Sequence, residues 1–293
     1  LPISSKGALS YGKLVLALGA DQIRLPLQGD AANEVLTVND LEDYARFRQA
    51  ITGKKKIAIL GAGLIGCEFA NDLVLGGYQV DVIDLAPQAL GRLLPEIAAK
   101  ELQGKLGDAG VHWHFGTTAE SVNRNGDVLE IQLANGKVIQ ADVVLSAVGL
   151  KPRLDLAKAT GIKTGVGIQV NRALETNVQN IYAIGDCAEV EGLVLPYVMP
   201  IMQAARALAP TLTGQRTDLT YPAMPVMVKT PAFATIVSPP AKGAEGEWKI
   251  MPAEGGLEAR FESTDGKLLG FALMGTATAQ RSALSKELPP ILQ

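Results

Sequence analysis

The chain has 293 residues, of which 47% are hydrophobic and 19% charged, and its formal net charge is −3. This length suits one large or two modest domains, and so small a charge excludes the basic footprint of a nucleic-acid or anionic-membrane binder. No apolar run approaches the length of a membrane span, and we expect no secretory signal at the N-terminus. Two separate cysteines and two histidines form no CxxC and no zinc pattern, which favours a reducing, cytoplasmic setting.

The first predicted element is a short apolar strand over residues 14–20, which contains Gly19 near its end. A loop rich in turn-forming residues follows, from Pro26 to Asn33. Residues 40–50 then have apolar positions at helical spacing.

Residues 56–84 carry the most specific pattern in the chain: a strand, a glycine-rich turn, a helix, and a second strand that ends in Asp84. Gly61 allows the sharp turn, Gly63 lets the backbone approach a pyrophosphate, and Gly66 lets the helix pack close to the strand. The helix start offers unpaired N–H groups to the phosphates. Asp84 can accept ribose hydroxyls and would repel a 2′-phosphate. The pattern predicts NAD binding, and the alternative is an ordinary βαβ turn with chance glycines.

A helix over 95–109 and four strands over 111–115, 119–123, 128–133 and 138–139 are predicted next. Asn125-Gly126 and Asn135-Gly136 are hairpin turn signals between these strands. An apolar strand over 142–149 completes a domain that we expect to combine a parallel sheet with an antiparallel hairpin layer. His112 and His114 alternate along one of these strands and are expected to share one face without a catalytic role.

A second unit is predicted after this domain. Residues 180–186 form a strand that ends in Gly185-Asp186, and residues 200–213 form a helix with a proline in its first turn. Val198 and Met199 are expected just ahead of that helix. From residue 216 onward, prolines and five short strands (224–229, 234–237, 247–251, 257–262 and 268–274) precede a helix over 277–288, which indicates a small α+β domain.

The order of these motifs resembles that of FAD-dependent pyridine nucleotide reductases, and within them the bacterial rubredoxin reductases. The strand-glycine element at 14–20, the glycine turn at 61–68 and the Thr176–Asp186 stretch correspond to a first FAD-domain element, the NAD site and the second FAD signature. The finer resemblance lies in residues 61–73, 185–190, 197–200, 228–231, 238–240 and 286–289.

The resemblance implies an α/β flavoprotein with two Rossmann-like dinucleotide-binding domains and a small C-terminal α+β domain. We therefore expect a remnant of the FAD domain over 1–34, an NAD-binding domain over 35–153, the second part of the FAD domain over 154–215 and the C-terminal domain over 216–293. The glycine motif that opens the family's FAD domain has no counterpart here, so we expect the N-terminal FAD-motif segment to be missing from this chain.

The implied activity takes electrons from NADH through FAD to rubredoxin or a similar iron–sulfur-type carrier, as in the supply of an alkane hydroxylase. The resemblance assigns NAD contacts to Gly61, Gly63, Leu64, Ile65, Gly66, Glu68, Asp84 and Gly149, and FAD contacts to Gly19, Asp186, Val198, Met199 and Lys229. It assigns no metal, no acid–base catalyst and no nucleic-acid or membrane partner. From pattern alone, the helix dipole already accounts for an acid at Glu68, and a snorkelling side chain is the favoured interpretation of Lys229.

Other readings stay open. A ferredoxin reductase or another NADH:acceptor flavoprotein would use the same cofactors. A disulfide or peroxide reductase is a second enzymatic reading, although neither a CxxC nor a C-terminal-domain histidine supports it. A nucleotide-binding redox sensor or an inactive fragment is the non-enzymatic reading.

Overall fold

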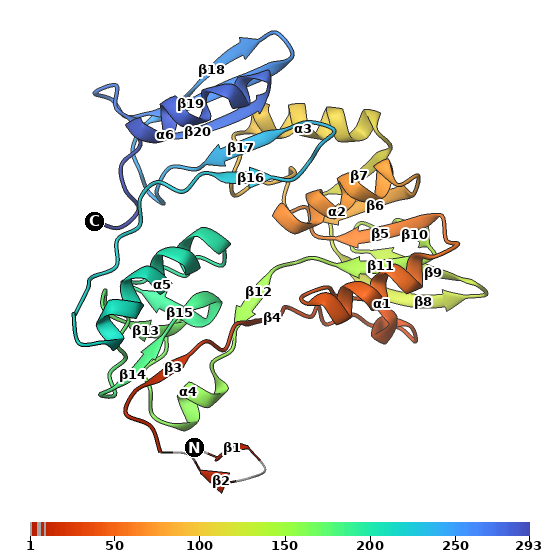
Figure 1. Ribbon diagram of the computed structural model, residues 1–293. Coiled ribbons are helices and arrows are strands. Elements are labelled where there is room, and N and C mark those ends of the chain that lie inside the picture. The colour runs from red at the N-terminus through yellow and green to blue at the C-terminus, as the bar shows by residue number, and fades with distance from the viewer. Residues whose placement is uncertain (1, 5–6, 9) are drawn as a thin grey trace. The chain divides into compact units, whose positions relative to one another are not determined.

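The computed structural model describes residues 2–4, 7–8 and 10–293, which form two compact units (Figure 1). One unit combines the residues up to Asp21 with Leu150–Met224 and Pro290–Gln293. The other combines Gln22–Gly149 with Pro225–Pro289 and contains the glycine-rich turn. Both units are therefore built from segments that are distant in the sequence.

The predicted βαβ unit is present and belongs to a four-stranded parallel sheet of order β11-β5-β6-β7. Its elements are β5 (Lys56–Leu60), α2 (Leu64–Leu75), β6 (Gln79–Asp84), α3 (Glu96–Asp108), β7 (Val111–Phe115) and β11 (Val143–Ser146). After its first residue, β5 is buried throughout, as its unbroken apolar run requires for a strand covered on both faces. The neighbouring helix α1 (Leu41–Ile51) is capped by Asp40, whose side chain accepts the Asp43 N–H.

The predicted antiparallel layer is also present, in the order β10-β9-β8. It consists of β8 (Ala119–Asn125), β9 (Val128–Leu133) and β10 (Val138–Ala141), and the short η1 helix (Ala32–Glu34) lies nearby. The first hairpin turn lies one residue later than predicted, because Asn125 still pairs with Val128 and leaves Gly126-Asp127 as the loop. Gly126 has a positive φ of 60°, which explains the glycine at this position.

The C-terminal part of the same unit is the expected α+β structure, an antiparallel sheet of order β16-β17-β20-β19-β18. Its elements are β16 (Val226–Val228), β17 (Thr235–Ser238), β18 (Glu247–Ala253), β19 (Gly256–Glu262), β20 (Leu268–Gly275), η3 (Thr276–Gln280) and α6 (Arg281–Glu287). Val228, Phe233 and Val237 belong to the same buried cluster as Ala70 of α2 and Leu102 of α3. The sheet and the helices α2 and α3 thus share one hydrophobic core.

In the first unit, β14 pairs in parallel with β3, so the two segments that resemble FAD-domain motifs lie side by side. The elements are β1 (Pro2–Ser4), β2 (Gly7–Ala8), β3 (Leu14–Leu16), β4 (Ala20–Gln22, which reaches the boundary with the other unit), β12 (Leu150–Pro152), α4 (Asp155–Ala159), β13 (Ile168–Val170), β14 (Ile181–Ala183), η2 (Gly185–Cys187), β15 (Ala188–Val190) and α5 (Val198–Leu212). Tyr221 pairs with Leu292 and so holds the end of the chain on this unit.

One helix boundary differs from the prediction. Helix α5 begins at Val198, two residues before the predicted start, so Val198 and Met199 are its first two residues. Pro200 is tolerated at the third position because the first four N–H groups of a helix have no acceptor within the helix.

Candidate dinucleotide and flavin sites

The three glycines of the turn after β5 meet three different surroundings. Gly61 has a φ of 108°, and a Cβ there would lie 2.6 Å from the carbonyl oxygen of Ala147. At Gly66 a Cβ would lie 1.9 Å from the carbonyl oxygen of Gly61. At Gly63, by contrast, a Cβ would meet no heavy atom within 4 Å. The close packing of the backbone therefore requires glycine at positions 61 and 66, whereas Gly63 leaves open space.

That open space lies where α2 begins. Gly63 is the N-cap of α2 and has no side chain with which to bond the first N–H groups. These groups stay available to a ligand, and the positive end of the helix dipole favours an anion there. The turn therefore fits the pyrophosphate of a dinucleotide, with Leu64 and Ile65 as the first two helical residues.

Asp84 lies beside this turn, at the end of β6. One carboxylate oxygen accepts the N–H of Ala62, and the other accepts the N–H of Ala86 at 2.7 Å. The side chain therefore ties the glycine turn to the second strand. Because each carboxylate oxygen can accept more than one hydrogen bond, it retains acceptor capacity for ribose hydroxyls.

Glu68 and Lys229 are in contact, although the sequence patterns treated them separately. Glu68 lies on α2, and its Oε1 accepts the backbone N–H of Lys229 at 3.0 Å. The Lys229 side chain is exposed, on the segment that follows β16. Gly149 follows β11 with a φ of 112°, and its carbonyl accepts the N–H of Ile23 at 3.0 Å.

On the other unit, Asp186 lies in the η2 turn that follows β14. Its Oδ1 is buried and has no hydrogen-bond partner within the described part of the chain. Burial raises the pKa of this carboxyl group above the usual aspartate range. A buried, unsatisfied acceptor is unfavourable by itself, so the position fits a hydroxyl-bearing ligand such as the ribityl chain of a flavin.

The start of α5 offers a second feature for a flavin. Its N-cap Tyr197 makes no side-chain capping bond, and Val198 and Met199 are 73% and 51% exposed. The first N–H groups are thus without a side-chain partner and can face a negatively charged ring edge. Gly19, which follows β3, has a φ of 71°.

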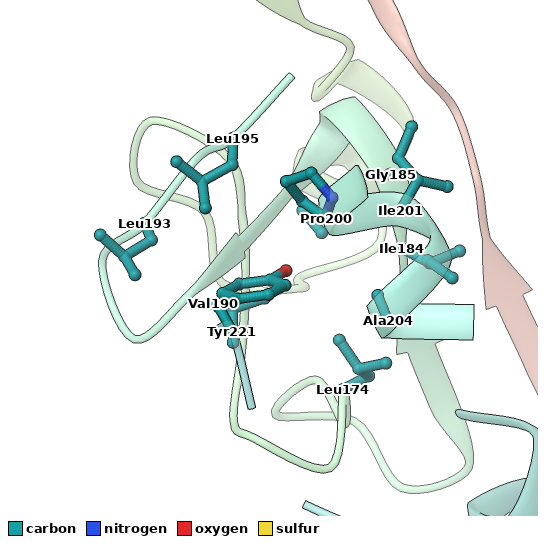
Figure 2. Close-up of a pocket in the computed structure, with 11 residues that line it drawn as sticks. Leu174, Ile184, Gly185, Val190, Leu193, Leu195, Pro200, Ile201, Ala204 and Tyr221 are labelled. Carbon is teal, nitrogen blue, oxygen red and sulfur yellow. The ribbon is translucent and has the colours of Figure 1, made fainter. Parts of the chain in front are cut away.

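An apolar cavity lies beside this helix (Figure 2). Gly185 and Pro200 line it together with Tyr221, whose pKa burial raises above its usual range. The cavity presents no charged side chain. We therefore interpret this cavity as a gap in the packing between α5 and the rest of its unit.

Both cysteines are free and buried. Burial, with the nearby charges of Asp84 and Glu68, raises the pKa of Cys67 to about 12, so this thiol stays protonated. His114 Nε2 lies 2.7 Å from Asp81 Oδ1, whereas His112 Nδ1 lies 3.9 Å from the same oxygen. In the described residues, no three His, Cys, Asp or Glu side chains gather as a metal site, and no helix could cross a membrane.

Asn71 is the residue that the sequence patterns missed. It is completely buried on α2, and its Oδ1 accepts the N–H of Ala232 at 3.1 Å. The signal in the sequence is its place on the apolar face of α2, one turn after Cys67 and one turn before Val74, because a polar side chain that is buried there needs a partner.

Comparison with known proteins decides the family. Residues 3–209 match the pyridine nucleotide-disulphide oxidoreductase family. The chain belongs to this family. Residues 218–288 also match a rubredoxin binding C-terminal domain, and this match covers most of the small α+β region.

Individual relatives confirm the resemblance found in the sequence. A rubredoxin-NAD(+) reductase of Alcanivorax borkumensis is 50% identical over 97% of this chain and 75% of its own length. One from Acinetobacter baylyi is 50% identical over 96% of this chain and 73% of its own length. The crystal structure of the ferredoxin reductase for the CYP199A2 system of Rhodopseudomonas palustris superposes with a TM-score of 0.87 at 28% identity, covering 98% of this chain and 74% of that one. The α/β fold expected from the sequence is confirmed.

Proposed function

We propose that this chain is an NADH-dependent FAD oxidoreductase that delivers electrons to rubredoxin. The observation that carries the proposal is the match to a rubredoxin binding domain at residues 218–288, on a chain that also holds the family's dinucleotide motif. The two relatives named rubredoxin-NAD(+) reductase agree with this assignment.

In this proposal the glycine turn binds NADH. The N–H groups at the start of α2 hold the pyrophosphate, in the space that Gly63 leaves open. Asp84 accepts the ribose hydroxyls and disfavours the additional phosphate of NADPH. Glu68, the fifth residue of α2, and Gly149, which follows β11, complete the proposed NAD set.

The other unit binds FAD through Gly19, Asp186 and the start of α5. Asp186 accepts a ribityl hydroxyl with the oxygen that otherwise has no partner. The N–H groups of Val198 and Met199 stabilise negative charge on the reduced ring. Lys229 is proposed as a further FAD contact because residues 228–231 resemble the family motif.

When bound, FAD supplies the conversion between a two-electron hydride donor and a one-electron acceptor. The residues of the chain bind and orient the cofactors, and no side chain needs to move a proton for hydride transfer. The 2.7 Å contact between His114 Nε2 and Asp81 Oδ1 agrees with a structural place for this histidine. We also propose a cytoplasmic location, because both cysteines are free thiols, the state that a reducing compartment maintains.

A ferredoxin reductase is the second candidate, favoured by the superposition on the enzyme of the CYP199A2 system. Anaerobic stopped-flow measurements with the NADH-reduced flavoprotein separate the candidates. Rubredoxin, a [2Fe–2S] ferredoxin and a disulfide are offered as acceptors in parallel. Fastest reduction of rubredoxin supports the proposal, faster reduction of ferredoxin replaces the acceptor, and reduction of the disulfide alone overturns the reaction class. If the purified protein shows no flavin spectrum, or a flavin spectrum that NADH does not bleach, the non-enzymatic reading is favoured.

A further inference from the structure

The segment Lys229–Ala232 follows β16, lies before β17 and belongs to no sheet. The backbone N–H of Lys229 is accepted by Glu68, and that of Ala232 by Asn71. Between them, the N–H of Thr230 bonds to Val228, and Pro231 has no N–H to satisfy. The two N–H groups at the ends of the segment therefore depend on side chains of α2.

The two acceptors have the spacing that such a contact needs. Glu68 and Asn71 are three residues apart, so they lie on the same face of α2. Both bonds span 161 residues of sequence. Asn71 is fixed in turn, because its Nδ2 donates to Asp72 Oδ1 at 3.0 Å.

Apolar packing continues this contact on either side. Val228 and Phe233 flank the segment and are buried in the cluster that includes Ala70. The ammonium group of Lys105 on α3 lies 5.8 Å from the centre of the Phe233 ring. The ends of the segment are anchored by packing, and its own backbone is placed by the two polar side chains.

We propose that Glu68 and Asn71 are positioning residues that fix the Lys229–Ala232 segment on the dinucleotide-binding helix. Through this segment they set the position of β16 and β17, the first strands of the rubredoxin binding domain. The inference rests on the proposed function for its acceptor. It gives Glu68 a role as a hydrogen-bond acceptor, for which its negative charge is not required.

The proposal predicts different effects on the two half-reactions, reduction by NADH and electron transfer to rubredoxin. Reduction by NADH needs the glycine turn and the start of α2, whereas the side-chain hydrogen bonds of Asn71 go to Ala232 and Asp72. Docking of rubredoxin needs the surface of the rubredoxin binding domain, and the position of the segment sets the position of the first strands of that domain. Loss of the Asn71 acceptor should therefore raise the KM for rubredoxin and leave NADH-driven reduction of a small dye unchanged.

The first test uses Asn71→Leu in the flavin-loaded protein, with Leu75→Ala as the matched control, because Leu75 is on the same helix and 59% exposed. Amide hydrogen exchange at Ala232 should speed up by about tenfold, the effect of losing one hydrogen bond. The KM for rubredoxin should rise while ferricyanide turnover stays constant. The control should change neither quantity.

The second test compares Glu68→Gln with Glu68→Met and needs no change in the buried core. Glutamine keeps a side-chain oxygen that can accept the Lys229 N–H, so exchange at Lys229 should stay slow. Methionine has no such acceptor, so exchange there should accelerate.

Unchanged exchange in both Asn71→Leu and Glu68→Met would overturn the proposal. So would a fall in ferricyanide turnover that matches the loss of rubredoxin reduction in Asn71→Leu. If the unsubstituted protein fails to reduce rubredoxin, the proposed function fails, whereas the exchange rates still decide whether the two side chains hold the segment.

Discussion

Gly63 and Gly66 belong to the same turn, yet alanine at the two positions should have opposite effects. In Gly66→Ala the new Cβ would lie 1.9 Å from the carbonyl oxygen of Gly61, so the backbone must shift. Overpacking of this kind costs about 1–3 kcal/mol. Because the clashing atoms belong to the backbone, we take the upper part of that range, about 2–3 kcal/mol, of which the better helix propensity of alanine offsets about 1 kcal/mol. We expect a net destabilisation of about 1–2 kcal/mol, which lowers Tm by roughly 2–8 °C for a domain of this size.

Gly63→Ala should leave the fold intact. Gly63 has a φ of −74°, which alanine adopts freely, and its Cβ would meet nothing within 4 Å. Stability should change by less than about 1 kcal/mol, because the freedom that alanine removes from the unfolded chain offsets its poorer fit at the N-cap position. The methyl group would instead occupy the space where phosphate approaches the helix. Weakening that interaction by about 1–2 kcal/mol lowers the affinity for NADH by roughly tenfold.

Thermal unfolding and the KM for NADH in dye reduction measure the two effects side by side. Gly104→Ala is the matched control, because Gly104 is inside α3 and a Cβ there also meets nothing within 4 Å. It should raise Tm through helix propensity and leave the KM unchanged. The reasoning is refuted if Gly63→Ala lowers Tm as much as Gly66→Ala, or if Gly63→Ala binds NADH normally.

Four further predictions concern single side chains. Asp84→Ser should reduce the preference for NADH over NADPH, measured as the ratio of kcat/KM values; equal values in the unsubstituted enzyme would contradict this. Asp186→Ala should lower FAD occupancy, measured as flavin absorbance per protein. Because burial raises the pKa of Asp186, its folded form holds a proton more tightly than the unfolded form. Its contribution to apoprotein stability is therefore full below the usual aspartate pKa of about 3.9 and is lost as pH rises through the raised pKa. Asp186→Asn should remove this pH dependence from urea unfolding. Cys67→Ser and Cys187→Ser should retain NADH-driven dye reduction, since both thiols are buried and free; loss of flavin reoxidation with FAD still bound would show that one of them is a redox centre.

Local patterns predicted the parts of the fold whose causes are local. The βαβ unit followed from glycine spacing and apolar strands, and the antiparallel layer followed from turn signals. The start of α5 was misplaced because Pro200 suggested a first helical residue, whereas proline is equally tolerated one or two positions later. The hairpin at Gly126 moved by one residue because register depends on the pairing partner as well as on the turn residues.

Local sequence patterns could not predict the contacts of Glu68. Its acceptor role depends on a backbone N–H that is 161 residues away. The same is true of the core that α2 and α3 share with the C-terminal sheet. Helical periodicity identifies a buried face but does not say which segment covers it, because apolar packing is not directional. The role of each candidate cofactor residue was predicted from motif order and stays a prediction, which the variants described above would test.

The arrangement of the chain in two interleaved units constrains the order in which the protein becomes stable during synthesis. The chain passes between the units at Asp21–Gln22, Gly149–Leu150, Met224–Pro225 and Pro289–Pro290. The helices of the dinucleotide-binding part leave the ribosome long before Val228 and Phe233, which fill their core. Until then an apolar face stays uncovered, and exposed faces of this kind make nascent chains prone to aggregation. A stop codon shortly after α5 would therefore leave the glycine-rich turn intact in sequence but remove part of the core beneath its helix.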